Sequence, residues 1–207
     1  MKYFKFMVCL FCMVIFLAIS FLVLKYDRLD FDFRIYNAII SMKSDFWTAF
    51  FRVITFFASV PFLVFITILS LVIRIHKKYK VFISLNMVND VILNNAFKYI
   101  IRRNRPLEWF LVNESGYSFP SGHAMGACCF YGLLIYLLYR SSLSNKYKVI
   151  GIIGLIILIL LIGVSRIYLG VHYATDVIGG MMLACAYLII YITFMGRKVL
   201  DTKEKSV

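Results

Sequence analysis

Six apolar runs, each about as long as a bilayer is thick, constrain the fold of this chain more than any other feature of its sequence. A helix needs about 20 mainly apolar residues to cross the hydrocarbon core of a membrane. The chain is 62% hydrophobic, whereas soluble domains are roughly 45–50% apolar. The runs predict an all-α polytopic membrane protein, with six transmembrane helices in one bundle and a single domain over residues 1–207. They cover residues 6–24, 53–73, 81–97, 121–139, 149–165 and 177–195.

Lys and Arg residues gather between these runs, which is typical of residues that orient membrane helices. With the N-terminus in the cytoplasm, the cytoplasmic segments hold 13 of the 23 Lys and Arg residues. The positive-inside rule therefore favours a cytoplasmic location for both termini. The net charge of +13 does not indicate nucleic-acid binding, because the basic residues are not collected into one stripe or face.

The first apolar run has two interpretations. Lys2 and Lys5 precede it, as basic residues precede the apolar part of a cleaved signal peptide. At about 19 residues the run is longer than that part usually is, so we expect an uncleaved first helix. The five cysteines lie inside apolar runs and predict neither a disulfide framework nor a metal site. They are Cys9, Cys12, Cys128, Cys129 and Cys185.

The segment from Tyr26 to Trp47 mixes aromatic and charged residues. Such a mixture fits either a short helix in the plane of the lipid headgroups or a plain loop, and the sequence leaves both open.

Three polar clusters border the later runs. "KYIIRRNRP" extends from Lys98 to Pro106, "PSGH" starts at Pro120, and "SRIYLGVHYATD" extends from Ser165 to Asp176. Because successive membrane helices run in opposite directions, the six-helix topology places all three clusters at the outer end of the bundle.

The residue types in these clusters suit an anion. Lys98, Arg105 and Arg166 bring three cations to one membrane boundary. Ser121 and Gly122 begin a helix, where free backbone N–H groups can bind a phosphate. Each cluster alone also fits a lipid-headgroup contact or a helix cap. Their convergence, together with two histidines, favours a catalytic phosphate site.

The order and spacing of these residues resemble the type-2 phosphatidic acid phosphatase family of membrane lipid phosphatases, whose phosphate site is shared with vanadium haloperoxidases. The family pattern is K-x6-R-P, then P-S-G-H, then S-R-x5-H-x3-D. The chain matches all eleven fixed positions. These positions are Lys98, Arg105, Pro106, Pro120, Ser121, Gly122, His123, Ser165, Arg166, His172 and Asp176.

The resemblance implies a role for each of these residues. His172 is expected to be the nucleophile that forms a phosphohistidine, and Asp176 to orient its imidazole. His123 is expected to protonate the leaving group and then to activate water. Neither a metal nor another cofactor is implied, because the cations take the place of Mg²⁺. The groups expected to hold the phosphoryl oxygens are Lys98, Arg105, Ser121, the Gly122 amide and Arg166, with Pro120 and Ser165 in support.

A polar stripe in the third run lies outside these motifs. Asn86, Asp90, Asn94 and Lys98 recur every four residues, and a charge near mid-membrane costs roughly 2.5–3.5 kcal/mol. One hypothesis is that the stripe supports Lys98 and places Asn94 near the substrate. The other, which we favour for Asn86 and Asp90, is ordinary hydrogen bonding between helices. Glu108, Trp109 and Glu114 fit either a role in headgroup access or ordinary surface positions.

The implied activity is metal-independent hydrolysis of lipid phosphates or pyrophosphates at the outer face of the cell membrane. Undecaprenyl pyrophosphate, phosphatidylglycerophosphate and phosphatidic acid are the candidate substrates, and the surrounding membrane lipids are the other expected partners. An alternative enzyme activity is transfer of the phosphoryl group to an acceptor other than water. A non-catalytic lipid-phosphate binder or scramblase is a third possibility, and the presence of both His123 and His172 argues against it. No pattern in the sequence sets an oligomeric state.

Overall fold

The structure is a computed structural model that describes residues 2–74, 76–106, 110–112 and 114–196. Within these residues all regular structure is helical, and no strand occurs. The all-α class predicted from the sequence is thereby confirmed. In chain order the elements are α1 (Lys2–Lys25), α2 (Asp30–Ile40), α3 (Asp45–Phe56), α4 (Val60–Val72), α5 (Lys77–Ile101), α6 (Gly122–Arg140), α7 (Asn145–Tyr168), α8 (Ala174–Tyr191) and the π-helical η1 (Ile192–Gly196).

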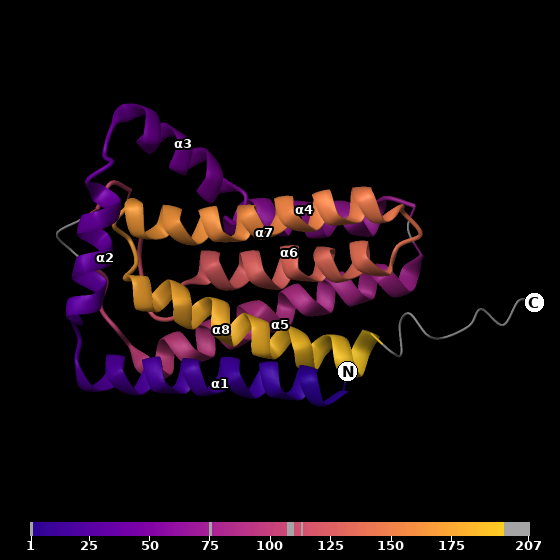
Figure 1. Cartoon of the computed structure of the whole chain (residues 1–207), viewed down its shortest axis with the longest axis horizontal. Helices are drawn as coiled ribbons and strands as arrows, with labels where there is room; N and C mark the ends of the chain where they lie inside the picture. The colour runs from indigo at the N-terminus through magenta and orange to yellow at the C-terminus, as the bar shows by residue number, and fades with distance from the viewer. Residues whose placement is uncertain (1, 75, 107–109, 113, 197–207) are drawn as a thin grey trace, which may run out of the picture.

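The run predicted at 53–73 is divided between two helices, because the chain turns after Phe56. Ser59 caps the second of these helices, and its side chain accepts a hydrogen bond from the Phe62 N–H at 3.4 Å. A proline, Pro61, stands in the first turn of α4, where its missing N–H costs little because that group has no partner inside the helix. The run therefore forms two helices that meet at an angle, with α3 inclined to the bundle and α4 running along it (Figure 1).

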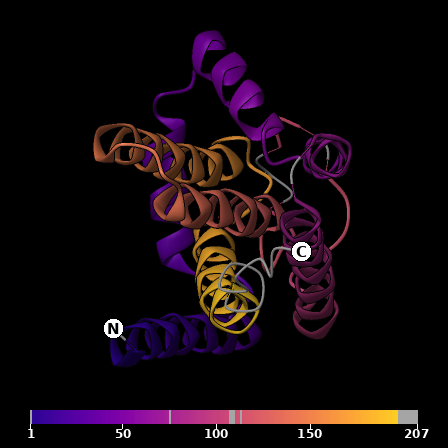
Figure 2. The same cartoon turned by 90° about the vertical axis from the view of Figure 1, so that its right-hand side faces the viewer.

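Figure 1 shows α1 and α4–α8 running along the long axis of the molecule, while α2 crosses one end. The centre of the bundle is formed by α6 and α8, which pack against each other. Helix α1 packs on α8, whereas α5 and α7 pack on α6. Figure 2, which looks along the bundle from the end opposite α2, shows these helices nearly end-on.

Five helical segments in the described residues are long and apolar enough to cross a membrane. One of these segments, Asp45–Val72, contains both α3 and α4. Helix α5 is 25 residues long, but its polar residues make it too hydrophilic to count as a span by this measure. The predicted count of six spans is therefore not confirmed by helix length and composition. The qualifying segments are Tyr3–Lys25, Asp45–Val72, Gly122–Arg140, Asn145–Tyr168 and Ala174–Gly196.

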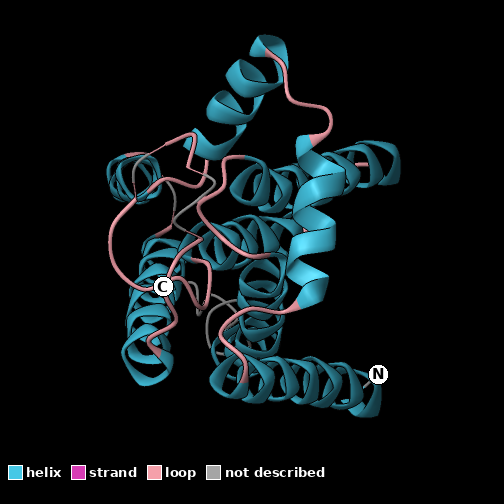
Figure 3. Ribbon diagram, turned by 90° about the vertical axis from the view of Figure 1, so that its left-hand side faces the viewer, coloured by secondary structure: helices cyan, strands magenta, loops and turns pink. Residues whose placement is uncertain are grey.

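The segment from Tyr26 to Trp47, for which the sequence allowed a helix or a loop, contains α2 and the start of α3. Figure 3, which views the end crossed by α2, shows this helix in front of the ends of the bundle helices and their loops. Tyr36 of α2 is buried against Ala124 of α6, Ile167 of α7 and Ala174 of α8. This apolar contact fixes α2 across the bundle end.

The two ends of the bundle carry different parts of the chain. Helix α1 begins and η1 ends at one end, where α5 and α7 also begin (Figure 1). At the other end α5 and α7 finish, and α6 and α8 start. All three polar clusters are therefore carried to the end that α2 crosses.

Candidate active site

The turn between α7 and α8 holds His172. Gly170 in this turn has a φ of 72°, a conformation that glycine adopts without strain. The backbone N–H of His172 donates to the carbonyl of Arg166 at 3.3 Å, which closes the turn. His172 is only 2% exposed, so the turn buries its imidazole among the helix ends.

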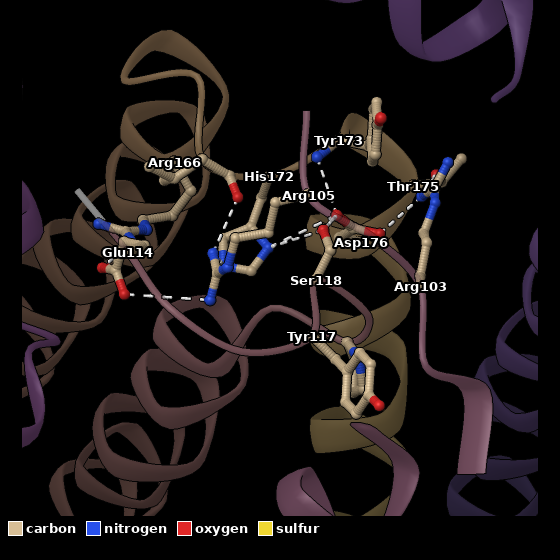
Figure 4. Close-up of polar contacts among 12 residues, drawn as sticks. Arg103, Arg105, Glu114, Tyr117, Ser118, Arg166, His172, Tyr173, Thr175 and Asp176 are labelled. Carbon is tan, nitrogen blue, oxygen red and sulfur yellow. Dashed lines mark hydrogen bonds and ion pairs between the residues drawn. The ribbon is translucent and has the colours of Figure 1, made fainter. Parts of the chain in front are cut away.

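The two nitrogens of the His172 ring have different neighbours (Figure 4). Nδ1 lies 3.5 Å from Asp176 Oδ2 and 3.5 Å from the Ser118 hydroxyl. Nε2 lies 3.2 Å from Nη1 of Arg105. These contacts assign the ring proton to Nδ1, facing the carboxylate. The Nε2 lone pair then faces the position at which Arg105 would hold an anion.

Electrostatics favour the neutral form of this imidazole. Burial lowers the pKa of His172 well below its usual 6.5, and the charges of Arg105, Arg166 and Lys98 lower it further. Burial also lowers the pKa of Arg105, against the opposing effect of Glu114, but a guanidinium remains charged at any physiological pH. A neutral imidazole has a free lone pair and can act as a nucleophile or a base.

Asp176, which is fully buried, uses both carboxylate oxygens. Oδ2 accepts from the Ser118 hydroxyl and, at 2.9 Å, from the Tyr173 N–H. Oδ1 accepts from Nη1 of Arg103 at 2.6 Å. Hydrogen bonds from charged donors to a buried carboxylate are strong and directional. The oxygen that faces His172 is therefore held in place by two other groups, and Arg103 holds the second oxygen of the same carboxylate.

Arg166, 1% exposed, reaches the same cluster from the end of α7. Its Nη1 donates to the Thr55 hydroxyl of α3 at 2.7 Å, and its Nη2 donates to Glu114 Oε1 at 2.5 Å. Its Nε is buried and has no hydrogen-bond partner among the described residues. Because an unpaired buried donor is costly, this N–H marks a position for an acceptor that none of these residues supplies.

Backbone carbonyls of the loop before α6 orient the other two cations. Arg105 donates to the carbonyls of Ser115 and Gly116, each at 3.0 Å, and to that of Val171 at 2.9 Å. Lys98 Nζ donates to the Tyr117 carbonyl at 2.9 Å. Three cations from α5, the following loop and α7 are thereby gathered beside His172.

The start of α6 offers further unpaired donors. Ser121 is fully buried and makes no capping hydrogen bond, and within the described part of the chain its hydroxyl has no partner. Asn94 of α5 donates to the Pro120 carbonyl at 3.2 Å. A Cβ at Gly122 would lie 3.2 Å from Asn94 Oδ1, so glycine permits this close contact. The contact between Asn94 and Pro120 thus fixes the start of α6 relative to α5.

His123 lies in the first turn of α6, next to Gly122. The charges of Arg166, Arg105 and Lys98 act on its ring, as does His172. The structure therefore brings the second histidine of the predicted site within electrostatic range of the first.

For Ser165, Asn86 and Asp90, whose support of the site was one interpretation of the sequence, the side chains have no hydrogen bond to this cluster among the described residues. Ser165 donates to the Ile162 carbonyl of its own helix at 2.6 Å. Asn86 donates to the Cys129 carbonyl of α6 at 2.8 Å, which confirms hydrogen bonding between helices at this position. Asp90 is buried and its Oδ1 has no partner. Within the described residues, no hydrogen bond or ion pair joins Asp90 to the cluster.

The sequence motifs do not include several residues that contact the predicted site. Arg103 and Ser118 both donate to Asp176, while Asp32 and Thr175 contact Arg103. The only local signal was the presence of three arginines in "RRNRP". Glu114, for which two interpretations were left open, contacts Arg166 directly.

Glu108 and Trp109 lie outside the described residues. Among the residues that the structure does describe, no group of three or more His, Cys, Asp or Glu could hold a metal ion. The cluster instead combines cations, unpaired N–H and O–H donors and a neutral imidazole. That combination can bind a tetrahedral oxyanion and attack it.

The chain is similar to known phosphatases. Phosphatidylglycerophosphatase B of Bacillus subtilis is 47% identical over 96 residues, which are 45% of this chain and 47% of that protein. An undecaprenyl-diphosphatase of Sulfolobus acidocaldarius is 27% identical over 143 residues, 66% of this chain and 63% of that protein. The chain therefore spans about half of the first relative's length and less than two thirds of the second's.

A solved structure and a family model extend this similarity. The crystal structure of a transmembrane PAP2-type phosphatidylglycerolphosphate phosphatase from Bacillus subtilis matches with a TM-score of 0.81 and 26% identity, over 96% of this chain and 98% of that one. The model of the PAP2 superfamily matches residues 79–200, a range that contains all three polar clusters. The chain belongs to the PAP2 superfamily.

Proposed function

We propose that this protein is a phosphatase that hydrolyses membrane lipid phosphates or pyrophosphates through a phosphohistidine intermediate. The observation that carries the proposal is the geometry of His172. Its Nδ1 side faces Asp176, while its Nε2 faces Arg105 and the neighbouring cations. Covalent phosphoryl transfer needs a nucleophile whose orientation is fixed by one neighbour and whose reactive atom faces an anion-binding cluster.

In the first step Nε2 of His172 attacks phosphorus, and the bond from phosphorus to the leaving oxygen breaks. His123 enters this step protonated, because the anionic substrate offsets the charges of the surrounding cations. It donates its proton to that oxygen, which departs as a lipid alcohol or a lipid phosphate. Asp176 stabilises the positive charge that develops on the imidazole. Lys98, Arg105, the unpaired Nε of Arg166 and the donors at the start of α6 stabilise the phosphoryl oxygens. Stabilisation of this kind is usually the largest contribution to such a barrier.

In the second step water attacks the phosphohistidine. His123, now neutral, accepts a proton from the water, and the bond from phosphorus to Nε2 breaks. Inorganic phosphate leaves, and both histidines return to their starting forms. The first step leaves His123 neutral, which is the protonation state that the second step requires. The fixed cations carry out the charge neutralisation that Mg²⁺ provides elsewhere, so the proposed cycle is independent of metal.

The candidate substrates follow from the relatives and from the site. Two relatives are named for phosphatidylglycerophosphate and undecaprenyl diphosphate, and phosphatidic acid presents the same terminal phosphate. All three substrates place a phosphate at the membrane surface, and the cluster lies at one end of the helix bundle.

We assign six membrane spans, with α5 as the sixth, both termini in the cytoplasm and the site on the outer side. Two observations support this assignment. Helix α5 runs alongside the qualifying spans (Figure 1), and the polar groups that lower its hydropathy include Asn86, which is buried against α6. With this orientation the cytoplasmic segments of the sequence hold 13 of the 23 Lys and Arg residues, in the direction that the positive-inside rule favours.

The test is phosphate release by the purified protein in detergent micelles that contain EDTA. The three candidate lipids are offered separately in water enriched in ¹⁸O. His172→Ala is the test variant and His76→Ala is the matched control, since His76 is an exposed histidine at the start of α5. We expect the wild type and the control to release ¹⁸O-labelled phosphate, and the His172 variant to lose at least about 10³-fold in kcat.

The ranking of rates names the substrate class. Wild-type protein that released phosphate only after addition of Mg²⁺ would contradict the metal-independent mechanism. Release from no lipid, by protein that elutes as a folded species, would contradict hydrolysis. In that case a phosphorylated alcohol formed from an added acceptor would indicate a transferase.

A further inference from the structure

Arg103 is a buried cation that the proposed chemistry does not use. It is 2% exposed, and its side chain contributes none of that exposed area. Arg105, two residues later in the same loop, faces His172, whereas Arg103 points to the opposite side of Asp176 (Figure 4). A buried charge persists only where it is paired and hydrogen-bonded, so its partners indicate its purpose.

Two carboxylates share this guanidinium. Nη1 donates to Asp176 Oδ1 at 2.6 Å, and Nη2 donates to Asp32 Oδ2 at 2.8 Å. Nη1 also donates to the Thr175 hydroxyl at 2.8 Å, and Nε and Nη2 donate to the Asp27 carbonyl. Every nitrogen of the guanidinium therefore has a partner, a geometry that a lysine ammonium cannot reproduce.

The face of the guanidinium is occupied as well. It stacks over the ring of Tyr173 with 4.0 Å between the guanidinium carbon and the ring centroid. Burial opposes the charge, but the carboxylates of Asp176 and Asp32 raise the pKa of Arg103 above its ordinary value. The cation is thus held permanently charged in one orientation beside the residue that faces His172.

Asp32 joins this arrangement from helix α2. It is 1% exposed, and its Oδ1 accepts from the Thr175 N–H at 2.8 Å and from the Thr175 hydroxyl at 2.9 Å. Thr175 lies in the first turn of α8, one residue before Asp176. A carboxylate is favourable at a helix N-terminus because the first backbone N–H groups lack partners inside the helix. Asp32 therefore connects α2 to the start of α8 and to Arg103.

We propose that Arg103 and Asp32 form a clamp that positions Asp176, so that helix α2 belongs to the catalytic apparatus of the protein. Asp176 Oδ1 is held by Arg103, which leaves Oδ2 to face His172. Asp32 balances the charge of Arg103 and ties it to α2. Arg103 is a positioning residue in this scheme, because it acts on the reaction only through Asp176. The inference rests on the proposed function.

The charge arrangement predicts opposite effects from removing the two members of the clamp. Without Arg103 no cation lies between the buried carboxylates of Asp32 and Asp176, so the His172–Asp176 pair would hold a proton more tightly. Without the charge of Asp32, the full charge of Arg103 acts on Asp176, and the pair would hold a proton less tightly. The charged and titratable groups around the His172–Asp176 pair are Asp32 from α2, Lys98 from α5, Arg103 and Arg105 from the following loop, His123 from α6, Arg166 from α7 and Tyr173 from the α7–α8 turn.

The experiment compares pH profiles of kcat for lipid phosphate hydrolysis. Arg103→Gln is expected to lower kcat about 10–100-fold, to move the acidic limb of the profile upward by about one pH unit, and to leave KM within about threefold. Asp32→Asn is expected to move the same limb downward. In the double variant Arg103→Gln/Asp32→Asn the limb returns towards its wild-type position. Arg103→Lys restores part of kcat, because an ammonium keeps the positive charge but lacks the planar five-donor geometry of a guanidinium.

Arg102→Gln is the matched control, because Arg102 is an exposed arginine next to Arg103, and we expect its profile to equal that of the wild type. A rise in KM with unchanged kcat in Arg103→Gln would overturn the proposal and make Arg103 a substrate-binding residue. An unshifted acidic limb in both Arg103→Gln and Asp32→Asn would also overturn it. If Arg103→Gln does not fold, Asp32→Asn decides alone. A wild type that hydrolyses no lipid phosphate contradicts the proposed function instead.

Discussion

The imidazole of His172 lies among cations and away from bulk water, and this environment decides its protonation. Burial first, and then Arg105, Arg166 and Lys98, lower its pKa well below 6.5. The neutral form that nucleophilic attack requires is therefore the resting form at neutral pH. The same shift has a consequence for stability. Below about pH 6.5 the unfolded chain takes up a proton at this residue that the folded protein does not, so stability falls as the pH falls towards the folded value.

This protonation can be measured directly by histidine ring NMR of the protein in micelles. The chain has three histidines, and comparison with a His172→Gln variant assigns the His172 signal. We expect the ring of His172 to remain neutral at a pH about one unit below its ordinary value of 6.5. A midpoint above that ordinary value would show that the carboxylate of Asp176 outweighs burial and the three cations, contrary to the shift described here.

Two serines that match the family motifs equally well perform different tasks in this structure. Ser121 keeps a buried hydroxyl without a partner, ready to donate to an anion. Ser165, which matches the third motif equally well, donates to the carbonyl of Ile162 in its own helix. In the sequence, both serines were recognised in the same way, by residue type and by spacing within a motif. Only the neighbouring helices distinguish a group that remains available from one that is used internally.

At the scale of elements, the site depends on how closely α8 approaches the start of α6. A Cβ at Gly180 of α8 would lie 2.8 Å from the backbone carbonyl oxygen of Ser121 and 3.6 Å from the Met125 nitrogen. The backbone N–H of Ser121 also donates to the carbonyl of Asp176 at 3.0 Å. The absence of a side chain at Gly180 therefore sets the position of the donors at the start of α6 relative to Asp176.

Gly180→Ala is expected to move the start of α6 and to lower kcat/KM for lipid phosphate about 10²-fold, because misplacement by about 1 Å is enough for such a loss. Gly154→Ala is the control, since a Cβ at Gly154 of α7 meets nothing within 4 Å. That change is expected to leave activity unaltered and to stabilise the helix by up to about 1 kcal/mol. Equal activity of the two variants, measured beside their thermal unfolding, would exclude this role for Gly180.

At the scale of the whole molecule, the arrangement of helices makes a prediction about sidedness. Ser41, after α2, and Ser142, between α6 and α7, are both exposed and lie at opposite ends of the bundle. In intact cells we expect Ser41→Cys to react with a membrane-impermeant maleimide. Ser142→Cys should react only after permeabilisation, with the unmodified chain as background. The reverse pattern would place the site on the cytoplasmic side and contradict the assigned orientation.

Most of the bundle could be predicted from the sequence, because the membrane imposes a length on each apolar run. Each run lies largely within helices of the structure, and alternation of direction brings the three polar clusters to one end. The helices that the sequence did not predict lie in segments whose composition fits more than one structure. The segment containing α2 had two interpretations, and the run at 53–73 is broken before Pro61. Polar residues that pack between helices, such as Asn86, keep α5 below the hydropathy of its neighbours.

The sequence by itself determined the helices, the motif residues and the end of the bundle at which they meet, because periodicity, spacing and membrane thickness act locally along the chain. The tertiary structure alone decided what surrounds Asp176. Two arginines two positions apart, Arg103 and Arg105, have the same charge and lie in the same loop, yet one faces Asp32 and the other faces His172. Asp32 meets Thr175 across 143 positions of sequence. Such a contact depends on how α2 packs across the bundle, which no local pattern encodes.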